Sequence, residues 1–216
     1  DSQSFQKELR DLVISLRFNS SRDNFGGHLK TLTKNKDRAF DLLTMALTQP
    51  RFDEEPVARM RSANQSRVRS SVSDPKWIAA RIMNDVAFSG HTYAQNSAGT
   101  LSSLDRITPD DLHAFAKGLH RDALHVSVVG DITAKDLKDV LNDVFSALPK
   151  TGAEDKAVDL ELQNQGGVFV FEKDIPQSIV EITQPGIDRT DADYHTAQIM
   201  NFVLGGSGFG SRRFAF

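Results

Sequence analysis

The sequence predicts an α+β fold, in which helices pack on an antiparallel sheet. Residues 12–20 and 25–33 each alternate apolar and polar side chains, and the polar turn SSRDN joins them, which is typical of a β-hairpin. Segments before and after this hairpin repeat apolar residues every three or four positions, which is typical of amphipathic helices. The run ALHVSVVGD (123–131), rich in β-branched residues, predicts a further buried strand between two helices.

The helices are expected over 5–12, 36–48, 53–72, 77–88 and 108–119, and from Thr133 to about Leu148. Asp53 and Thr108 are the expected N-caps of two of them, because their side-chain oxygens can accept from free N–H groups of the first turn. Pro109 strengthens the second of these starts, since proline is tolerated at the first helical position. In the last helix the apolar residues follow the i, i+3, i+4, i+7 pattern most closely.

Residues 150–165 are polar, charged and without periodicity, which predicts a linker. Beyond it, 167–174 and 177–186 are expected to be two strands, and 191–206 a helix that ends in glycine. We therefore expect one α+β domain over 1–149 and the start of a second domain over 166–216.

Composition narrows the class of protein. Of the 216 residues 39% are hydrophobic, which suffices for a sizeable core, and the net charge of −3 argues against a general nucleic-acid binder. The chain has no cysteine, which excludes disulfides and thiolate metal sites and fits either a reducing cytoplasm or a bacterial periplasm. No apolar run predicts a transmembrane helix, and no signal peptide is visible in the opening residues, so Asp1 is expected to be a mature, processed or trimmed start.

The stretch LGGSGFGSRR (204–213) raises the question of a phosphate-binding loop. Its glycine spacing does not fit GxGxxG, it follows a helix rather than a strand, and no lysine is near to complete a P-loop. A glycine C-cap followed by a flexible connection is therefore favoured, with a functional loop of another sort as the alternative.

Histidine and arginine residues are the other candidates for chemistry. None of the histidines forms an HxxxH, HxxEH or HxxH pair, so surface or capping roles are favoured over a metal site. They are His28, His91, His113, His120, His125 and His195. Helix 53–72 carries Arg59, Arg61, Arg67 and Arg69 without a compensating acid in its middle. Either a solvated face or an inward polar surface that lines a cavity or an interface would explain them.

Several segments together resemble the M16 family of zinc metallopeptidases, the pitrilysin, insulin-degrading and mitochondrial-processing-peptidase group. LTQPRFDEEPVARMR (47–61) resembles that family's M-L-x-x-P-x-F-D-E-E-x-I-E-R-E-R. The stretch 73–133, with AFSGHTY and VSVVGDIT, resembles its A-F-x-G-H-P-Y-G and V-x-x-V-V-G-D-V. Residues 169–213 resemble the opening of its second domain, from K-x-x-x-Q-S to N-x-I-L-G-G-G-x-x-S-R-L, although Arg213 stands where that motif has leucine.

The resemblance implies LuxS/metallohydrolase-like domains, each with an antiparallel sheet and packed helices, paired around a chamber that holds unfolded peptide. Residues 1–149 would then be the C-terminal part of the first domain, and 166–216 the start of the second. The glycine-rich loop would help to shape the chamber. Its residues are Gly205, Gly206, Ser207, Gly208, Phe209, Gly210 and Ser211.

Catalysis in this family needs an HxxEH motif, whose histidines hold zinc together with a distal glutamate. This sequence has no HxxEH. A gapless alignment through Phe52–Glu55 and Asp74–Pro75 places the two distal acidic positions, seven residues apart on one helix face, at Met60 and Arg67. An arginine repels the ion and offers no lone pair. The resemblance therefore implies no zinc and no catalytic residue in this chain, with zinc expected in a catalytic partner.

The resemblance thus implies a non-catalytic subunit that supports zinc-dependent peptide hydrolysis by an HxxEH-bearing partner subunit. Such subunits contribute an Arg and a Tyr within R-E-x-x-G-L-x-Y, a segment expected beyond Phe216. Two alternatives stay open: a structural or assembly homologue, or an active peptidase whose motif lies upstream of Asp1 and whose third ligand is Glu54 or Glu55. The partner could also be a second copy of the chain, and the periplasm is favoured over the cytoplasm.

Overall fold

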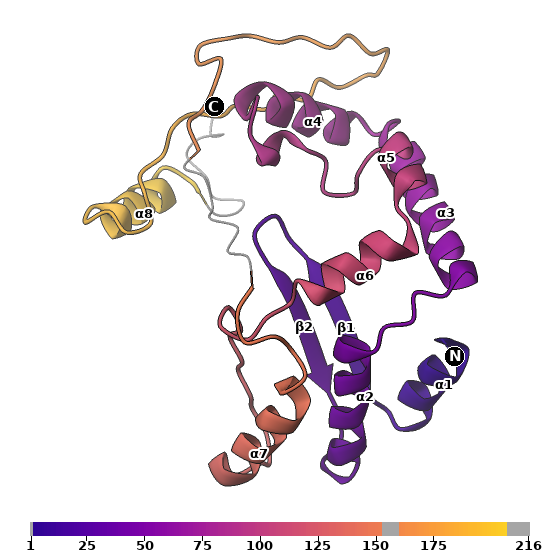
Figure 1. Ribbon diagram of the computed structural model, residues 1–216. Helices are drawn as coiled ribbons and strands as arrows, with labels where there is room; N and C mark the ends of the chain where they lie inside the picture. The colour runs from indigo at the N-terminus through magenta and orange to yellow at the C-terminus, as the bar shows by residue number, and fades with distance from the viewer. Residues whose placement is uncertain (1, 153–159, 207–216) are drawn as a thin grey trace.

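The computed structural model describes residues 2–152 and 160–206, whose elements follow one another along an open arc (Figure 1). Strands β1 (Ser15–Ser20) and β2 (Phe25–Lys30) form an antiparallel hairpin. The helices are α1 (Ser2–Asp11), α2 (Lys36–Thr48), α3 (Glu54–Ser71), α4 (Pro75–Ala87), α5 (Leu101–Arg106), α6 (Pro109–Lys117), α7 (Ala134–Phe145) and α8 (Tyr194–Val203), with short 3-10 turns η1 (Thr33–Asn35) and η2 (Thr92–Ala94). Separate runs of helices and antiparallel strands confirm the predicted α+β class.

The core lies where α1 and α2 pack on the base of the hairpin. Its fully buried centre is Leu42 of α2, beside Ala39, Leu9 of α1 and Ile14, which leads into β1. Burying a leucine side chain contributes about 1.5–3 kcal/mol. The side chain of Asn35 ties η1 to this core, because its Nδ2 donates to the carbonyl of Leu12 at 2.7 Å.

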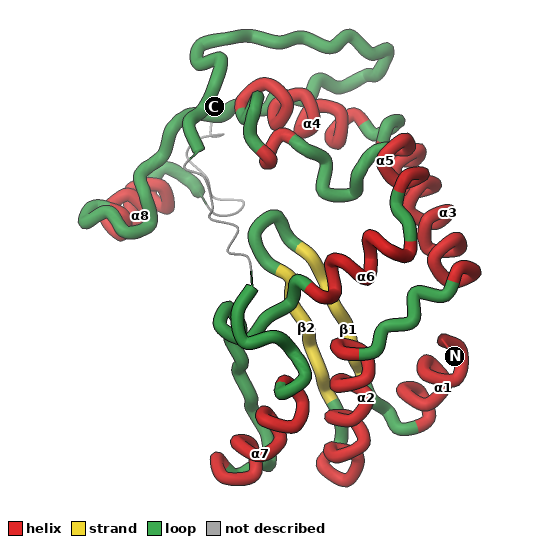
Figure 2. Tube along the Cα trace, viewed as in Figure 1, coloured by secondary structure: helices red, strands yellow, loops and turns green. Residues whose placement is uncertain are grey.

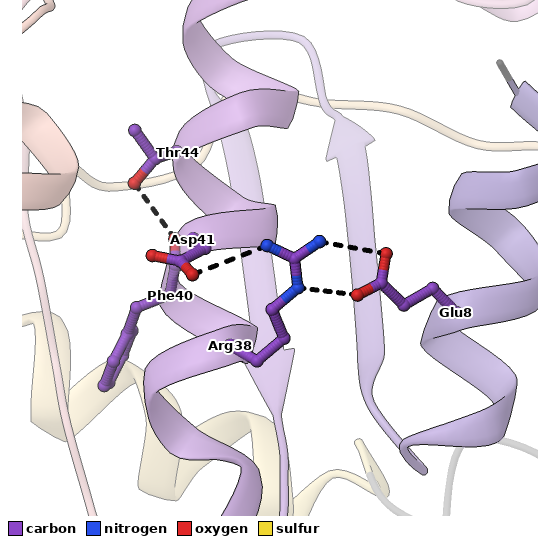
Figure 3. Close-up of polar contacts among 5 residues, drawn as sticks. All are labelled: Glu8, Arg38, Phe40, Asp41 and Thr44. Atoms are coloured by element: carbon purple, nitrogen blue, oxygen red, sulfur yellow. Dashed lines mark hydrogen bonds and ion pairs between the residues drawn. The ribbon is translucent and has the colours of Figure 1, made fainter.

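An ion pair joins the exposed side of the same two helices. Arg38 of α2 donates from Nε and Nη2 to the two carboxylate oxygens of Glu8 of α1, at 2.6 and 3.1 Å, and also reaches Asp41 (Figure 3). The hydrogen bond from Arg38 lowers the pKa of the Glu8 carboxyl, and the same bond raises the pKa of the Arg38 guanidinium. The pair fixes the orientation of α1, since a two-pronged arginine contact has a defined geometry.

Local capping signals fix where α4, α5 and α6 begin. Asp74 accepts from the N–H of Lys76, and Thr108 exchanges bonds with Asp111 in a capping box. The hydrogen bond from the Thr108 N–H lowers the pKa of the Asp111 carboxyl. Thr100 forms a second capping box and starts α5, a helix of six residues that the sequence pattern does not predict. Such a short helix contains too few turns to show a periodicity.

Three predicted strands are wrong. Residues 123–131, 167–174 and 177–186 have no regular structure, and Val129 is fully exposed. A strand needs a partner to satisfy its backbone groups, and among the described residues only β1 and β2 pair. The β-branched composition predicts an extended backbone, and it says nothing about whether a neighbour is in reach.

The last residues of the predicted linker contact the C-terminal end of α4. The N–H of Gln163 donates to the carbonyl of Ala87, and Asn164 Nδ2 donates to the carbonyl of Val86, both at 2.9 Å. These are carbonyls that a helix end leaves without partners. The division into two domains stays a prediction. Within the described ranges, none of the helices has the length and apolar character needed to span a bilayer.

Candidate functional site

Helix α3 carries the two positions that the resemblance singles out. It is 18 residues long and begins after Asp53, with Glu54 and Glu55 in its first turn. Asp53 occupies the N-cap position, but its side chain makes no capping bond there and instead accepts from Arg51 at 3.0 Å. The negative charges of this turn interact favourably with the positive, N-terminal end of the helix dipole. The predicted start of α3 is therefore confirmed, whereas the predicted capping bond of the Asp53 carboxylate is wrong.

Met60 and Arg67 lie on one face of α3, since seven residues correspond to about two helical turns. The Met60 side chain is more than half exposed, and Arg67 is exposed as well. The backbone carbonyl of Arg67 accepts from the Ser71 hydroxyl at 3.0 Å. A thioether and a guanidinium offer no set of ligands for zinc, so these two residues do not fit the metal that the family uses.

The remaining arginines of α3 occupy different environments. Arg59 forms an i, i+4 ion pair with Glu55, so the expectation that no acid compensates these arginines is wrong for Arg59. Arg61 turns inward: its Nη2 donates to the carbonyl of Ile107, and its Nε is buried with no partner in the part of the chain that the structure describes. A solvated face thus explains Arg59, and an inward polar surface explains Arg61.

A cavity of about 620 Å³ opens where α1, α2 and α3 approach α5 and α6. Twelve of its twenty wall residues are apolar, and the other eight are polar or charged. The wall residues are Ser2, Ser4, Phe5, Glu8, Leu42, Met45, Ala46, Gln49, Pro50, Arg51, Phe52, Asp53, Pro56, Val57, Met60, Arg61, Asn64, Leu104, Ile107 and Leu112. An apolar hollow with few polar groups is typical of sites for small ligands or apolar side chains. Met60 therefore borders a cavity, whereas sequence alone places it only on a helix face.

The glycines that follow α8 end that helix. Gly205 has φ of 105°, and its N–H donates to the carbonyl of Phe202 at 2.9 Å. The N–H of Gly206 donates to the carbonyl of Asn201 at 2.7 Å, which completes a Schellman motif. A Cβ at Gly206 would lie 2.3 Å from the Asn201 side chain. The predicted glycine C-cap is confirmed, and Ser207, Gly208, Phe209, Gly210 and Ser211 lie outside the described residues.

The histidines are dispersed. His91 caps η2 by accepting from the N–H of Tyr93 at 3.1 Å, and His113 meets the Phe52 ring edge-on at 5.0 Å. His120 lies between the carbonyl of Gly118 and the carboxylate of Asp122. Over residues 2–152 and 160–206, no three His, Asp or Glu side chains gather closely enough to hold a metal ion.

A family model described as the peptidase M16 inactive domain matches residues 106–216. Among named relatives, the non-peptidase homolog YmxG of Helicobacter pylori is 28% identical over 210 residues, covering 96% of this chain and 48% of YmxG. Subunit 1 of the mitochondrial cytochrome b-c1 complex of Bos taurus is 19% identical over 205 residues, covering 94% of this chain and 43% of that subunit.

A similar fold is found in the crystal structure of a peptidase M16 inactive domain from Pseudomonas fluorescens. Its TM-score is 0.76 at 22% sequence identity, over 98% of this chain and 52% of that one. The chain thus spans about half the length of the relatives that it matches.

Proposed function

Because this chain belongs to the family of peptidase M16 inactive domains, we propose that it is the non-catalytic partner of a zinc-bearing M16 peptidase subunit. In this role it supports peptide hydrolysis by the partner and binds no catalytic zinc of its own. The observation that carries the proposal is the pair Met60 and Arg67 on one face of α3, where an active subunit needs acidic side chains. A name given to a similar protein, non-peptidase homolog, is in keeping with it.

The chemistry of this face supports a role without metal. Zinc in a catalytic site is held by nitrogen or oxygen lone pairs, and a water molecule completes the coordination. Arg67 would place a permanent positive charge where the ion would lie, and its guanidinium offers no lone pair to a metal. Zinc is accordingly expected in the partner.

The cavity beside Met60 supports a contribution to peptide binding. Its apolar walls suit the side chains of an unfolded peptide, and Asn64, one turn along α3 from Met60, adds a polar group at its edge. The loop from Gly205 to Ser211 is proposed to shape the same chamber from the second domain. Proteolysis of a peptide by the partner would then depend on both chains.

The experiment measures zinc and peptidase activity for this chain alone and mixed with an HxxEH-bearing M16 subunit. We expect less than one zinc per chain, no cleavage of an unfolded peptide by the chain alone, and cleavage once the two subunits are combined. Zinc bound one per chain, with cleavage by the chain alone, would sink the proposal. Cleavage by the partner that is unaffected by this chain would sink it as well.

A pair of variants tests the α3 face itself. Arg67→Glu combined with Met60→Glu restores acidic side chains at both positions, and we expect no gain in activity of the chain alone, since HxxEH is also missing. Arg69→Glu is the control for the Arg67→Glu change, because it alters the charge by the same amount on a different face of the exposed helix. If Arg67→Ala removed zinc from the isolated chain, Arg67 would not be a residue that excludes the metal.

A structural role in a larger complex is the second candidate. It is favoured by the similarity to subunit 1 of the cytochrome b-c1 complex, a component of a multi-subunit assembly. Under this alternative the chain would co-purify with partner subunits, and deleting it would disrupt the assembly while peptide cleavage in the cell stays unchanged. Fractionation of the cell would test the proposed periplasmic location against the cytoplasmic one.

A further inference from the structure

The turn between β1 and β2 contacts the C-terminal end of α4. Arg22, in the turn between β1 and β2, lies 4.9 Å from the ring centre of Tyr93 and 5.8 Å from that of Phe88, and its Nη2 donates to Asn84 Oδ1 at 3.3 Å. Beside it, the Tyr93 hydroxyl donates to Asp23 at 2.6 Å. We call Arg22 and Asp23 the clasp. Figure 2 shows this turn reaching toward α4.

The same end of α4 holds the segment that follows the predicted linker. Gln163 and Asn164 bind the carbonyls of Ala87 and Val86, in the last turn of α4. Lys173 Nζ donates to the carbonyl of Ser73, two residues before the start of α4, at 3.2 Å. Residues 163–173 are therefore hydrogen-bonded near the C-terminal end of α4 and just before its N-terminal end.

The clasp and the linker contacts meet within one helical turn. Phe88, which stacks under Arg22, is the C-cap of α4 and directly follows Ala87, whose carbonyl accepts from Gln163. Asn84 is one turn earlier, and its carbonyl accepts from the N–H of Phe88. The contacts of the clasp and those of the linker thus fall on consecutive residues of the same backbone turn, Phe88 and Ala87.

We propose that the clasp of Arg22 and Asp23 fixes the last turn of α4 and, through it, the position of residues 160–206 relative to the hairpin. Burial of apolar side chains contributes little to holding that segment, since Val168, Val170 and Ile182 are more than three-quarters exposed. An arginine within about 6 Å of an aromatic ring centre is attracted to the face of the ring, and Arg22 lies within this distance of two rings. The inference concerns position and does not depend on the proposed function.

The first test is hydrogen exchange of the Gln163 amide, read by NMR in the intact chain with Arg22→Ala. We expect this amide to exchange about twofold to fivefold faster, as the loss of an exposed cation–π contact implies. Arg17→Ala is the matched control: Arg17 is exposed on the same hairpin and has no contact with α4. The amide of Leu42, in the core, should exchange at the parent rate in both variants.

Equal exchange of Gln163 in Arg22→Ala and the parent would overturn the proposal, as would an increase of the same size at Leu42, which would indicate general destabilisation. If Arg22→Ala does not fold, Tyr93→Phe provides the same test, because it removes only the hydroxyl that binds Asp23.

A second measurement reads position directly. The chain has no cysteine, so Lys34→Cys and Thr183→Cys, both exposed, accept spin labels on the hairpin side and on the segment after the linker. Arg22→Ala should broaden the distance distribution between the labels, and Arg17→Ala should leave it unchanged. An unchanged distribution in Arg22→Ala would show that the clasp does not set this position.

Discussion

The side chains of α3 point into three environments, although they belong to one helix. Arg59 pairs with Glu55 on the surface, Arg61 is drawn toward the carbonyl of Ile107, and Arg67 projects into solvent. A surface pair of this kind contributes little to stability, because water screens it. The buried Nε of Arg61 is the costlier feature, since a polar atom without a partner loses its hydration.

The environments of the α3 side chains could be predicted only partly from the sequence. The face shared by Met60 and Arg67 follows from helical periodicity and needs no structure. That Arg61 turns inward depends on Ile107, far along the chain, and no local pattern encodes such a contact. The clasp could not be predicted from the sequence for the same reason: Arg22 lies in an ordinary polar turn, and Tyr93 is 70 residues from its partner Asp23.

The hydroxyl of Tyr93 provides a prediction about pH. Its hydrogen bond to Asp23, helped by partial burial and by the charge of Asp23, raises the pKa of Tyr93, while Arg22 acts in the opposite direction. Among the residues that the structure describes, His91 also packs edge-on against the Tyr93 ring, at 4.8 Å between ring centres. A group whose folded-state pKa is raised stabilises the fold below its unfolded pKa and stops doing so as pH rises through the folded value. The clasp should therefore hold at neutral pH and open in alkali, above the ordinary pKa of tyrosine.

Tyrosinate absorbance measures this titration. The chain has two tyrosines, so Tyr194→Phe isolates the signal of Tyr93. Asp23→Ala in that background should move the titration of Tyr93 down toward its ordinary range, whereas Asp11→Ala, on the exposed end of α1, should not. A titration of Tyr93 that is the same with and without Asp23 would contradict the prediction.

At the scale of elements, helices could be predicted and strands could be predicted only in part. The bounds of α2 agree with the expected 36–48, and Thr108 starts α6, because caps and periodicity are local properties. The hairpin is also local, since its strands are joined by a short turn. The strand expected over 123–131 needed a distant neighbour, and neither propensity nor alternation reports whether one is present.

The packing of α2 on α1 and β1 leads to a prediction about stability. Leu42 is fully buried at the centre of this core, so Leu42→Ala removes its contacts and leaves a cavity. We expect a loss of about 2–5 kcal/mol in the free energy of unfolding, measured by chemical denaturation with circular dichroism. Leu32→Ala is the matched control. Because Leu32 is about half exposed, its truncation should lower the free energy of unfolding far less. Similar losses for the two variants would mean that this cluster is not the core.

At the scale of the whole molecule, burial is uneven. The hairpin, α1 and α2 share a core, whereas α8 and the extended segments on either side of residue 175 expose large apolar side chains. Ile199, Phe202 and Val203 of α8 are each more than half exposed. Monomeric proteins rarely leave that much contiguous apolar surface open, and larger patches are typical of protein–protein contacts. A partner, whether the proposed catalytic subunit or a second copy, would find its most apolar surface here.

An unpaired extended segment with apolar side chains on both faces is also prone to pair with another copy of itself. Val170 is 81% exposed within such a segment, so Val170→Lys should weaken self-association by adding a charge to the exposed backbone edge. Light scattering over a range of concentrations measures the effect, and the circular dichroism spectrum should not change, because Val170 lies outside every helix and strand. Val72→Lys is the matched control: it adds the same charge at an exposed valine that occupies the C-cap position of α3 and lies outside the segment over 168–171. If both substitutions reduced association equally, net charge would be the cause; if Val170→Lys had no effect, the segment over 168–171 would not be a contact between copies.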